Sequence, residues 1–185
     1  MPIRLCKTSI LVLSFLVSGI LTSNAQPVYS ADSAKITFYS FAPVEEITAT
    51  SVNAESSLNM NDGSVSARVR ITSFSFRKQL MQKHFNEQYM ESEKFPYASF
   101  NGKLSDELIS LPDYPQTLKT RVKGELTLKG VTQKIDEEVT LARKGENVIG
   151  LCTFKVKLSD YNIKVPRMLI KNIAEEVDVR LQFIY

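Results

Sequence analysis

Apolar and polar side chains alternate with a period of two along most of this chain, and this pattern constrains the fold more than any other feature. Residues 65–72, 121–129, 152–158 and 176–185 all show it, with an apolar side chain at nearly every second position. Such alternation places one face of a strand in a dry core and the other in water, which is typical of antiparallel sheets. The pattern therefore predicts an all-β protein.

Weaker strand signals lie between these stretches. Residues 35–41, 46–52, 97–104 and 135–143 are further strand candidates, and turns rich in glycine, asparagine and aspartate separate several of them. The total is about eight strands. Eight strands with one apolar face close naturally into a barrel, which has no exposed edges. We therefore expect a single antiparallel eight-stranded barrel.

One segment, residues 78–91, breaks the alternation. It contains no proline, glycine or β-branched residue, and Met81, Phe85 and Tyr89 recur at every fourth position. This spacing predicts an amphipathic helix that ends before Pro96. A single helix in an all-β chain is expected to cap or flank one open end of the barrel.

Residues 1–25 have the layout of a cleaved secretory signal peptide. Basic residues precede an apolar run over residues 10–20, and Ser23 and Ala25 supply small side chains just before the expected cleavage. The remaining domain, residues 26–185, is expected to be exported to the periplasm or secreted. Of the 23 Lys and Arg residues, two fall in the signal, so 21 remain against 20 Asp and Glu. This balance predicts no nucleic-acid partner.

Side chains that could carry catalysis are few and isolated. His84 is the single histidine, and a zinc site needs three or four ligands. The sequence contains neither a nucleophile elbow nor a phosphate-binding glycine loop. Cys152 is the one cysteine beyond the signal, and its place on an apolar strand face indicates a buried small hydrophobic residue. We therefore expect no enzyme activity, no metal and no cofactor.

Aromatic residues gather around the predicted helix. Half of the ten phenylalanines fall within residues 74–100. One interpretation is a core cluster that joins the helix to the barrel. The other is the mouth of an apolar cavity, which can hold a long hydrocarbon ligand without any catalytic group.

Two segments carry a resemblance to a known family. Residues 73–104 read SFSFRKQLMQKHFNEQYMESEKFPYASFNGKL, and residues 119–141 read KTRVKGELTLKGVTQKIDEEVTL. The KFPYASF stretch and the GELTLKGVT hairpin within them resemble recurring pieces of the YceI-like family of exported, lipocalin-shaped, isoprenoid-binding proteins. The resemblance implies a lipocalin-like barrel and a hydrophobic small-molecule partner, a polyisoprenoid or related lipid, and it supplies no catalytic residues.

The alternation and the resemblance together predict where such a ligand would bind. The inward rows of the barrel and its aromatic end should form an apolar wall, in which Ala67 and Gly124 leave space. The predicted wall consists of Val69, Ile71, Phe74, Phe76, Met81, Phe85, Phe100, Leu126, Leu128, Phe154, Val156, Leu181 and Phe183. Arg77 and His84 are the candidates for contact with a polar head group.

Two alternatives stay open on the sequence alone. One is a ligand-free periplasmic stress or interaction module, whose barrel is filled by its own side chains. The other is a small outer-membrane barrel, which the aromatic C-terminal residue and the apolar residues at every second position back to Val177 suggest; the absence of tryptophan argues against it. The preferred function is an exported protein that sequesters or carries a long apolar ligand, without stable membrane insertion.

Overall fold

The computed structural model describes residues 28–31, 33–41, 45–105, 111–165 and 174–185. The expected signal segment lies outside this part of the chain. None of the helices within it has the length and apolar composition needed to cross a membrane.

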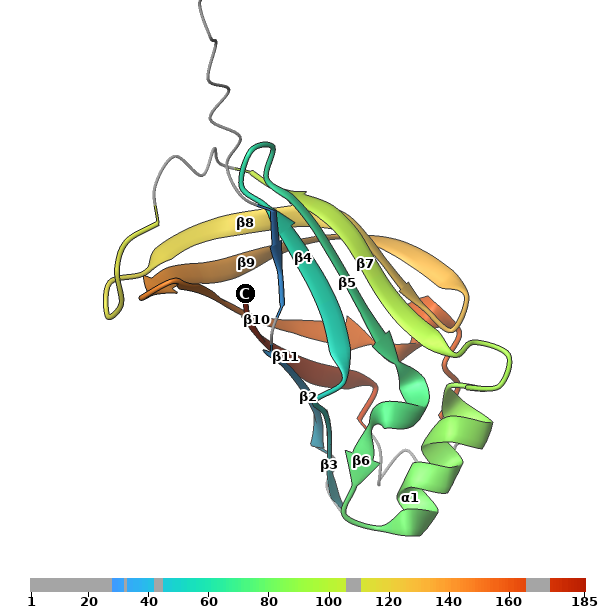
Figure 1. The fold of residues 1–185 in the computed structure, drawn as a ribbon. Helices are drawn as coiled ribbons and strands as arrows, with labels where there is room; N and C mark the ends of the chain where they lie inside the picture. Colours follow the sequence, from blue (N-terminus) through green and yellow to red (C-terminus); the bar gives the residue numbers. More distant parts are fainter. Residues whose placement is uncertain (1–27, 32, 42–44, 106–110, 166–173) are drawn as a thin grey trace, which may run out of the picture.

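The described residues form one antiparallel sheet of eleven strands, which curls into a barrel shape (Figure 1). The strands are β1 (Val28–Ser30), β2 (Ser33–Phe41), β3 (Glu46–Ser51), β4 (Ala54–Asn59), β5 (Ser64–Arg70), β6 (Ser75–Phe76), β7 (Tyr97–Leu104), β8 (Leu118–Leu128), β9 (Val131–Lys144), β10 (Asn147–Lys157) and β11 (Glu176–Ile184). Their order in the sheet is β1-β4-β5-β7-β8-β9-β10-β11-β2-β3-β6. The predicted all-β antiparallel class is confirmed, whereas the predicted number of strands was too low.

Three strands were missed, for two physical reasons. β1 and β6 are only three and two residues long, too short to show a period. β4 reads AESSLN, and its buried positions are Ser56 and Leu58. Because an inward serine replaces an apolar residue in β4, the alternation of hydrophobicity disappears although the alternation of burial remains.

The sheet is curled, but the ladder of hydrogen-bonded strands has two ends. β1 forms one end and β6 the other, and among the described residues no strand pairing joins them. The curl instead brings β2 and β4 into contact across the seam. Figure 1 shows β6 and helix α1 (Gln79–His84) together at one end of the curled sheet.

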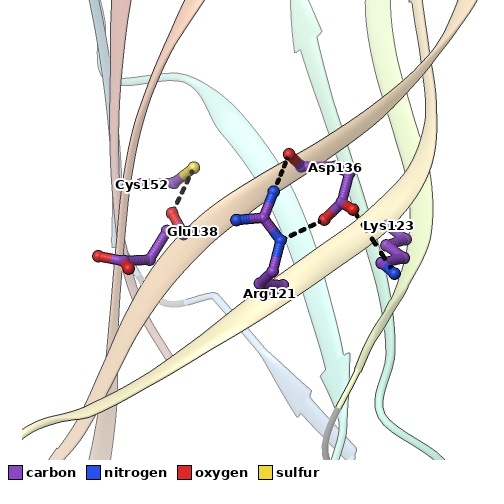
Figure 2. A network of polar contacts seen from close by, with 5 residues as sticks. All are labelled: Arg121, Lys123, Asp136, Glu138 and Cys152. Carbon is purple, nitrogen blue, oxygen red and sulfur yellow. Dashed lines mark hydrogen bonds and ion pairs between the residues drawn. The ribbon is translucent and has the colours of Figure 1, made fainter.

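Ion pairs join β8 and β9 on the outer face of the sheet. These two long strands pair from Leu118–Leu141 down to Leu128–Val131. On their outward side Arg121 bonds to Asp136 at 2.6 Å, and Lys123 lies 3.5 Å from the same carboxylate (Figure 2). Exposed pairs of this kind contribute little stability each, but opposite charges directly across a ladder favour this register over its neighbours.

The helical segment is shorter and less regular than predicted. α1 continues as a single π-helical turn over Phe85–Tyr89, in which the Met90 N–H donates to the Phe85 carbonyl at 2.9 Å. Glu91 then adopts φ of 48°, and the helix ends there. Leu80, although it falls inside the aromatic cluster in sequence, is 63% exposed and lies on the outer face of the helix.

Tyr185 joins the start of β10 to β4. Tyr185 exchanges two backbone hydrogen bonds with Val148, at the start of β10, and its side chain is buried. The Tyr185 hydroxyl lies 2.7 Å from Ser56 Oγ, which itself donates to the Ser66 carbonyl at 2.8 Å. Because the Ser56 proton is already used, Tyr185 donates to Ser56, and the inward serine of β4 thereby satisfies a buried phenol.

Candidate functional site

The curled sheet encloses an apolar cavity of about 360 Å³. Val122 and Leu128 both line it and lie six residues apart on β8, a separation of about 20 Å along a strand. The volume falls within the range of sites that bury small molecules, and an elongated apolar shape suits a chain rather than a compact polar metabolite. The interior is therefore not filled by the protein's own side chains.

Every apolar side chain in the predicted wall lies around this cavity, from Val69 on β5 to Phe183 on β11. This result follows from register. β10 pairs with β11 through Phe154–Val179 and Val156–Val177, so consecutive inward residues of the two strands stand side by side. That these side chains contact a ligand remains a prediction.

Four phenylalanines form the wall at the end beside α1. Phe85 from the π-helical turn has its ring centroid 5.0 Å from Phe76 and 5.8 Å from Phe74. Phe38 of β2 joins them, at 5.4 to 5.7 Å from each of the other three rings. Both interpretations of the aromatic residues therefore hold at once, because the cluster joins the helix to the sheet and also lines the cavity.

Phe38 is a wall residue that sequence analysis missed. It stands in the inward row Ile36, Phe38 and Ser40 of β2, and all three line the cavity. The signal was present as an alternation around Phe38, but Tyr39 and Phe41 beside it are also aromatic, so the two faces of the strand look equally apolar. On the outer face Tyr39 stacks on Phe41 and lies under Arg180.

The space expected at Gly124 is occupied by the protein itself. Gly102 and Gly124 face each other across β7 and β8, and the ring of Phe100 lies over both. A Cβ atom on either glycine would meet that ring and the backbone of the neighbouring strand. The glycines therefore allow an aromatic side chain to lie flat on the wall, and Phe100 itself lines the cavity.

The two predicted head-group residues have different positions. His84 is half-buried on α1 and lines the cavity. Arg77 is exposed and is not among the lining residues, so its position does not support contact with a ligand inside the cavity. Glu45, which sequence analysis did not select, lines the same end and is held by Lys78 at 2.5 Å.

Glu137 is a lining residue that sequence analysis did not select. Of the adjacent acids Glu137 and Glu138, only Glu138 points outward, where it bonds to Lys119 at 2.9 Å. Glu137 is half-buried and lines the cavity, and burial raises the pKa of its carboxyl group above the ordinary value. The sequence contained a signal for this position, because Glu137 stands between Ile135 and Val139 in an alternating apolar row.

Cys152 lies on the cavity wall as a protonated thiol. Burial, together with the nearby charge of Glu137, raises the pKa of Cys152 to about 12. Its Sγ donates a weak hydrogen bond to the Glu138 carbonyl at 3.4 Å (Figure 2). In the described part of the chain, no group of three or more His, Cys, Asp or Glu side chains is placed to hold a metal ion.

We expect Cys152 to react with thiol reagents far more slowly in the folded protein than in the unfolded chain. A pKa of about 12 lowers the thiolate fraction near pH 8 by roughly 1000-fold relative to an ordinary cysteine. Labelling of residues 26–185 with a disulfide reagent, with and without denaturant, measures this. As a control, Ser66→Cys on the outer face of β5, combined with Cys152→Ser, should label fast in the folded state. Equal labelling rates at Cys152 and at the cysteine introduced at position 66 would contradict the placement of Cys152 on the buried wall of the cavity.

A family model described as the YceI-like domain matches residues 28–185. No curated protein matches the chain. Among solved structures, a polyisoprenoid-binding domain from Saccharophagus degradans implicated in plant cell wall breakdown is similar, with a TM-score of 0.73 and 15% identity over 84% of this chain and 96% of that one.

Two further structures share the fold. BcnA from Burkholderia cenocepacia has a TM-score of 0.69 and 16% identity, and the match covers 82% of this chain and 96% of that one. A YCEI protein from Campylobacter jejuni has a TM-score of 0.55 and 14% identity, covering 97% and 98% of the two chains. At these identities the likeness concerns the fold.

Proposed function

The chain belongs to the YceI-like domain family, and we propose on that premise that it is an exported binding protein that sequesters or carries a long apolar molecule, a polyisoprenoid or related lipid, inside its curled sheet. The observation that carries the proposal is the cavity. It follows β8 for about 20 Å and is bounded almost wholly by apolar side chains. The polyisoprenoid-binding domain from Saccharophagus degradans, which has the same fold, supports this choice of ligand class.

The energetics favour such a ligand. Each CH₂ group moved from water into an apolar cavity contributes about 0.8 kcal/mol, so a chain of several isoprene units binds without any strong polar contact. The wall is also partly adaptable, because Met81 and Phe85 belong to the short helical segment. No catalytic step is needed for this function.

The two alternative functions are less well supported. A ligand-free module would have an interior filled by side chains, whereas this sheet leaves about 360 Å³. An outer-membrane barrel would face lipid, yet the outer side of β8 and β9 carries Lys119, Arg121 and Asp136 in ion pairs. Charged side chains facing lipid destabilise such barrels, so this face suits water.

The proposal is tested by ligand-induced stabilisation. Protein freed of lipid should unfold at a higher temperature when an isoprenoid quinone is added, because a ligand that binds only the folded state stabilises it. The same quinone head group without its tail is the matched control and should leave the unfolding temperature unchanged. An equal shift with both compounds, or no shift with the long-chain quinone, would count against an apolar-chain site.

A further inference from the structure

Glu137 interrupts an otherwise apolar row of the cavity wall. Along β9 the residues Ile135, Glu137, Val139 and Leu141 line the cavity, whereas Asp136 and Glu138 point outward. Opposite Glu137 in the register stands Val122 of β8, a buried residue. A carboxylate therefore occupies a position whose neighbours on the same face are aliphatic.

The two flanking acids have ion-pair partners, whereas Glu137 has none in the part of the chain that the structure describes. Asp136 is bonded to Arg121, and Glu138 to Lys119, on the outer face. Figure 2 shows this outer network around Arg121. Among the described residues, the Glu137 side chain makes no hydrogen bond and no ion pair, and burial raises the pKa of its carboxyl group. A half-buried carboxylate without a partner is costly, unless another group supplies the hydrogen bond.

Strands β9 and β10 also separate from each other at this level of the wall. β9 and β10 pair only from Asn147–Lys144 to Cys152–Val139. The residues of β9 that precede Val139 pair with β8 alone. β10 meanwhile continues along β11 to Lys157. Glu137 lies two residues before Val139, which is the last β9 residue that pairs with β10. On this edge of β9 the Glu138 carbonyl accepts from Cys152 Sγ rather than from a backbone N–H of β10, so the wall beside Glu137 carries polar groups of side chain and backbone.

Among the described residues, no cation is placed to neutralise an anionic ligand at this spot. Arg121, whose charge lowers the pKa of Glu137, is already engaged by Asp136 on the outer face. Of the other charged lining residues, Glu45 is paired with Lys78 and Arg68 with Glu55. His84 lies on α1, at the aromatic end of the cavity.

We propose that Glu137 selects the polar group of the ligand: the cavity accepts an apolar chain bearing a neutral hydrogen-bond donor, such as an alcohol or primary amide, and rejects chains ending in a carboxylate or phosphate. The proposal rests on the function proposed above and narrows its ligand class. A hydroxyl would donate to Glu137 in a charge-assisted bond, which is stronger than a neutral one. A carboxylate in the same place would meet a like charge in a medium of low dielectric constant.

The test compares farnesol with farnesoic acid, which share one isoprenoid chain and differ only at its head. Both are titrated near neutral pH against lipid-free protein that carries N-phenylnaphthylamine, a neutral fluorescent probe. Since the chain contains no tryptophan, the protein adds little background fluorescence. The variants are Glu137→Gln, which keeps the shape and removes the charge, and Glu138→Gln as the control on the outer face.

We expect farnesol to displace the probe from the wild-type protein at a concentration about 10-fold lower than farnesoic acid, since a hydrogen bond to a charged acceptor corresponds to a factor of this order. Glu137→Gln should bring the two ligands to within about 2-fold of each other, while Glu138→Gln keeps the full preference. Equal displacement by both ligands in the wild type, or an unchanged preference in Glu137→Gln, would overturn the role of Glu137 and leave the apolar site intact. Displacement by neither ligand would overturn the proposed function together with this inference.

Discussion

Ala67→Phe should lower the affinity for an apolar ligand by at least about 10-fold while leaving the sheet folded. Ala67 lies on β5 between Val65 and Val69, points inward and lines the cavity opposite Phe100. A phenyl group there takes the place of ligand atoms. Displacing only two CH₂ groups of ligand costs about 1.6 kcal/mol, which is already more than a factor of ten in the dissociation constant.

The matched control is Ser66→Phe, one residue away on the same strand. Ser66 is exposed on the outer face and does not line the apolar cavity, so a phenyl group there should leave the affinity unchanged. Probe displacement measures binding, and circular dichroism establishes that each variant keeps its strands. If Ala67→Phe binds as well as the wild type, the ligand does not occupy the part of the cavity that β5 lines.

Gly124→Val should destabilise the folded protein by about 3 kcal/mol or more, at the upper end of the cost of overpacking. A Cβ at this position would meet the Asn101 carbonyl and the Gly102 Cα of β7, together with the ring of Phe100. Two of these contacts are backbone atoms held in the ladder, which cannot move aside as a flexible side chain can. The β7–β8 pairing itself would have to open.

Denaturant unfolding of Gly124→Val and of Glu125→Val measures this loss. Glu125 is the next residue of β8 and is exposed on the outer face, where valine has room and a good strand propensity. Its substitution should change the free energy of unfolding by less than about 0.5 kcal/mol. A Gly124→Val protein as stable as the wild type would mean that Phe100 does not lie across the two glycines.

Long strands could be predicted from the sequence because their inward faces are mostly apolar. The predicted strand 97–104 coincides with β7, the pattern over residues 121–129 overlaps β8 up to Leu128, and residues 135–143 fall within β9. β4 could not be predicted in this way, since Ser56 is buried by a tertiary contact with Tyr185, 129 residues further along the chain. A local pattern contains no information about a hydrogen bond that distant.

The positions of the cavity-lining residues could also be predicted, because alternation determines which side chains share a face. Glu137 follows the same rule, because it stands in the row Ile135, Glu137 and Val139, all of which line the cavity. One feature of the candidate site depends instead on strand pairing. Phe100 fills the space beside Gly124 because the register places Gly102 opposite Gly124. That pairing cannot be deduced from the period alone.

Organic extraction of the protein purified under native conditions, followed by mass spectrometry, tests the central claim most directly. We predict close to one equivalent of a long apolar molecule in the extract of the wild-type protein, and much less in the extract of Ala67→Phe purified in parallel. Tail length and head group would then follow from its mass and fragmentation. An extract free of such a molecule, from a protein that also fails to bind an isoprenoid quinone after purification, would contradict the account.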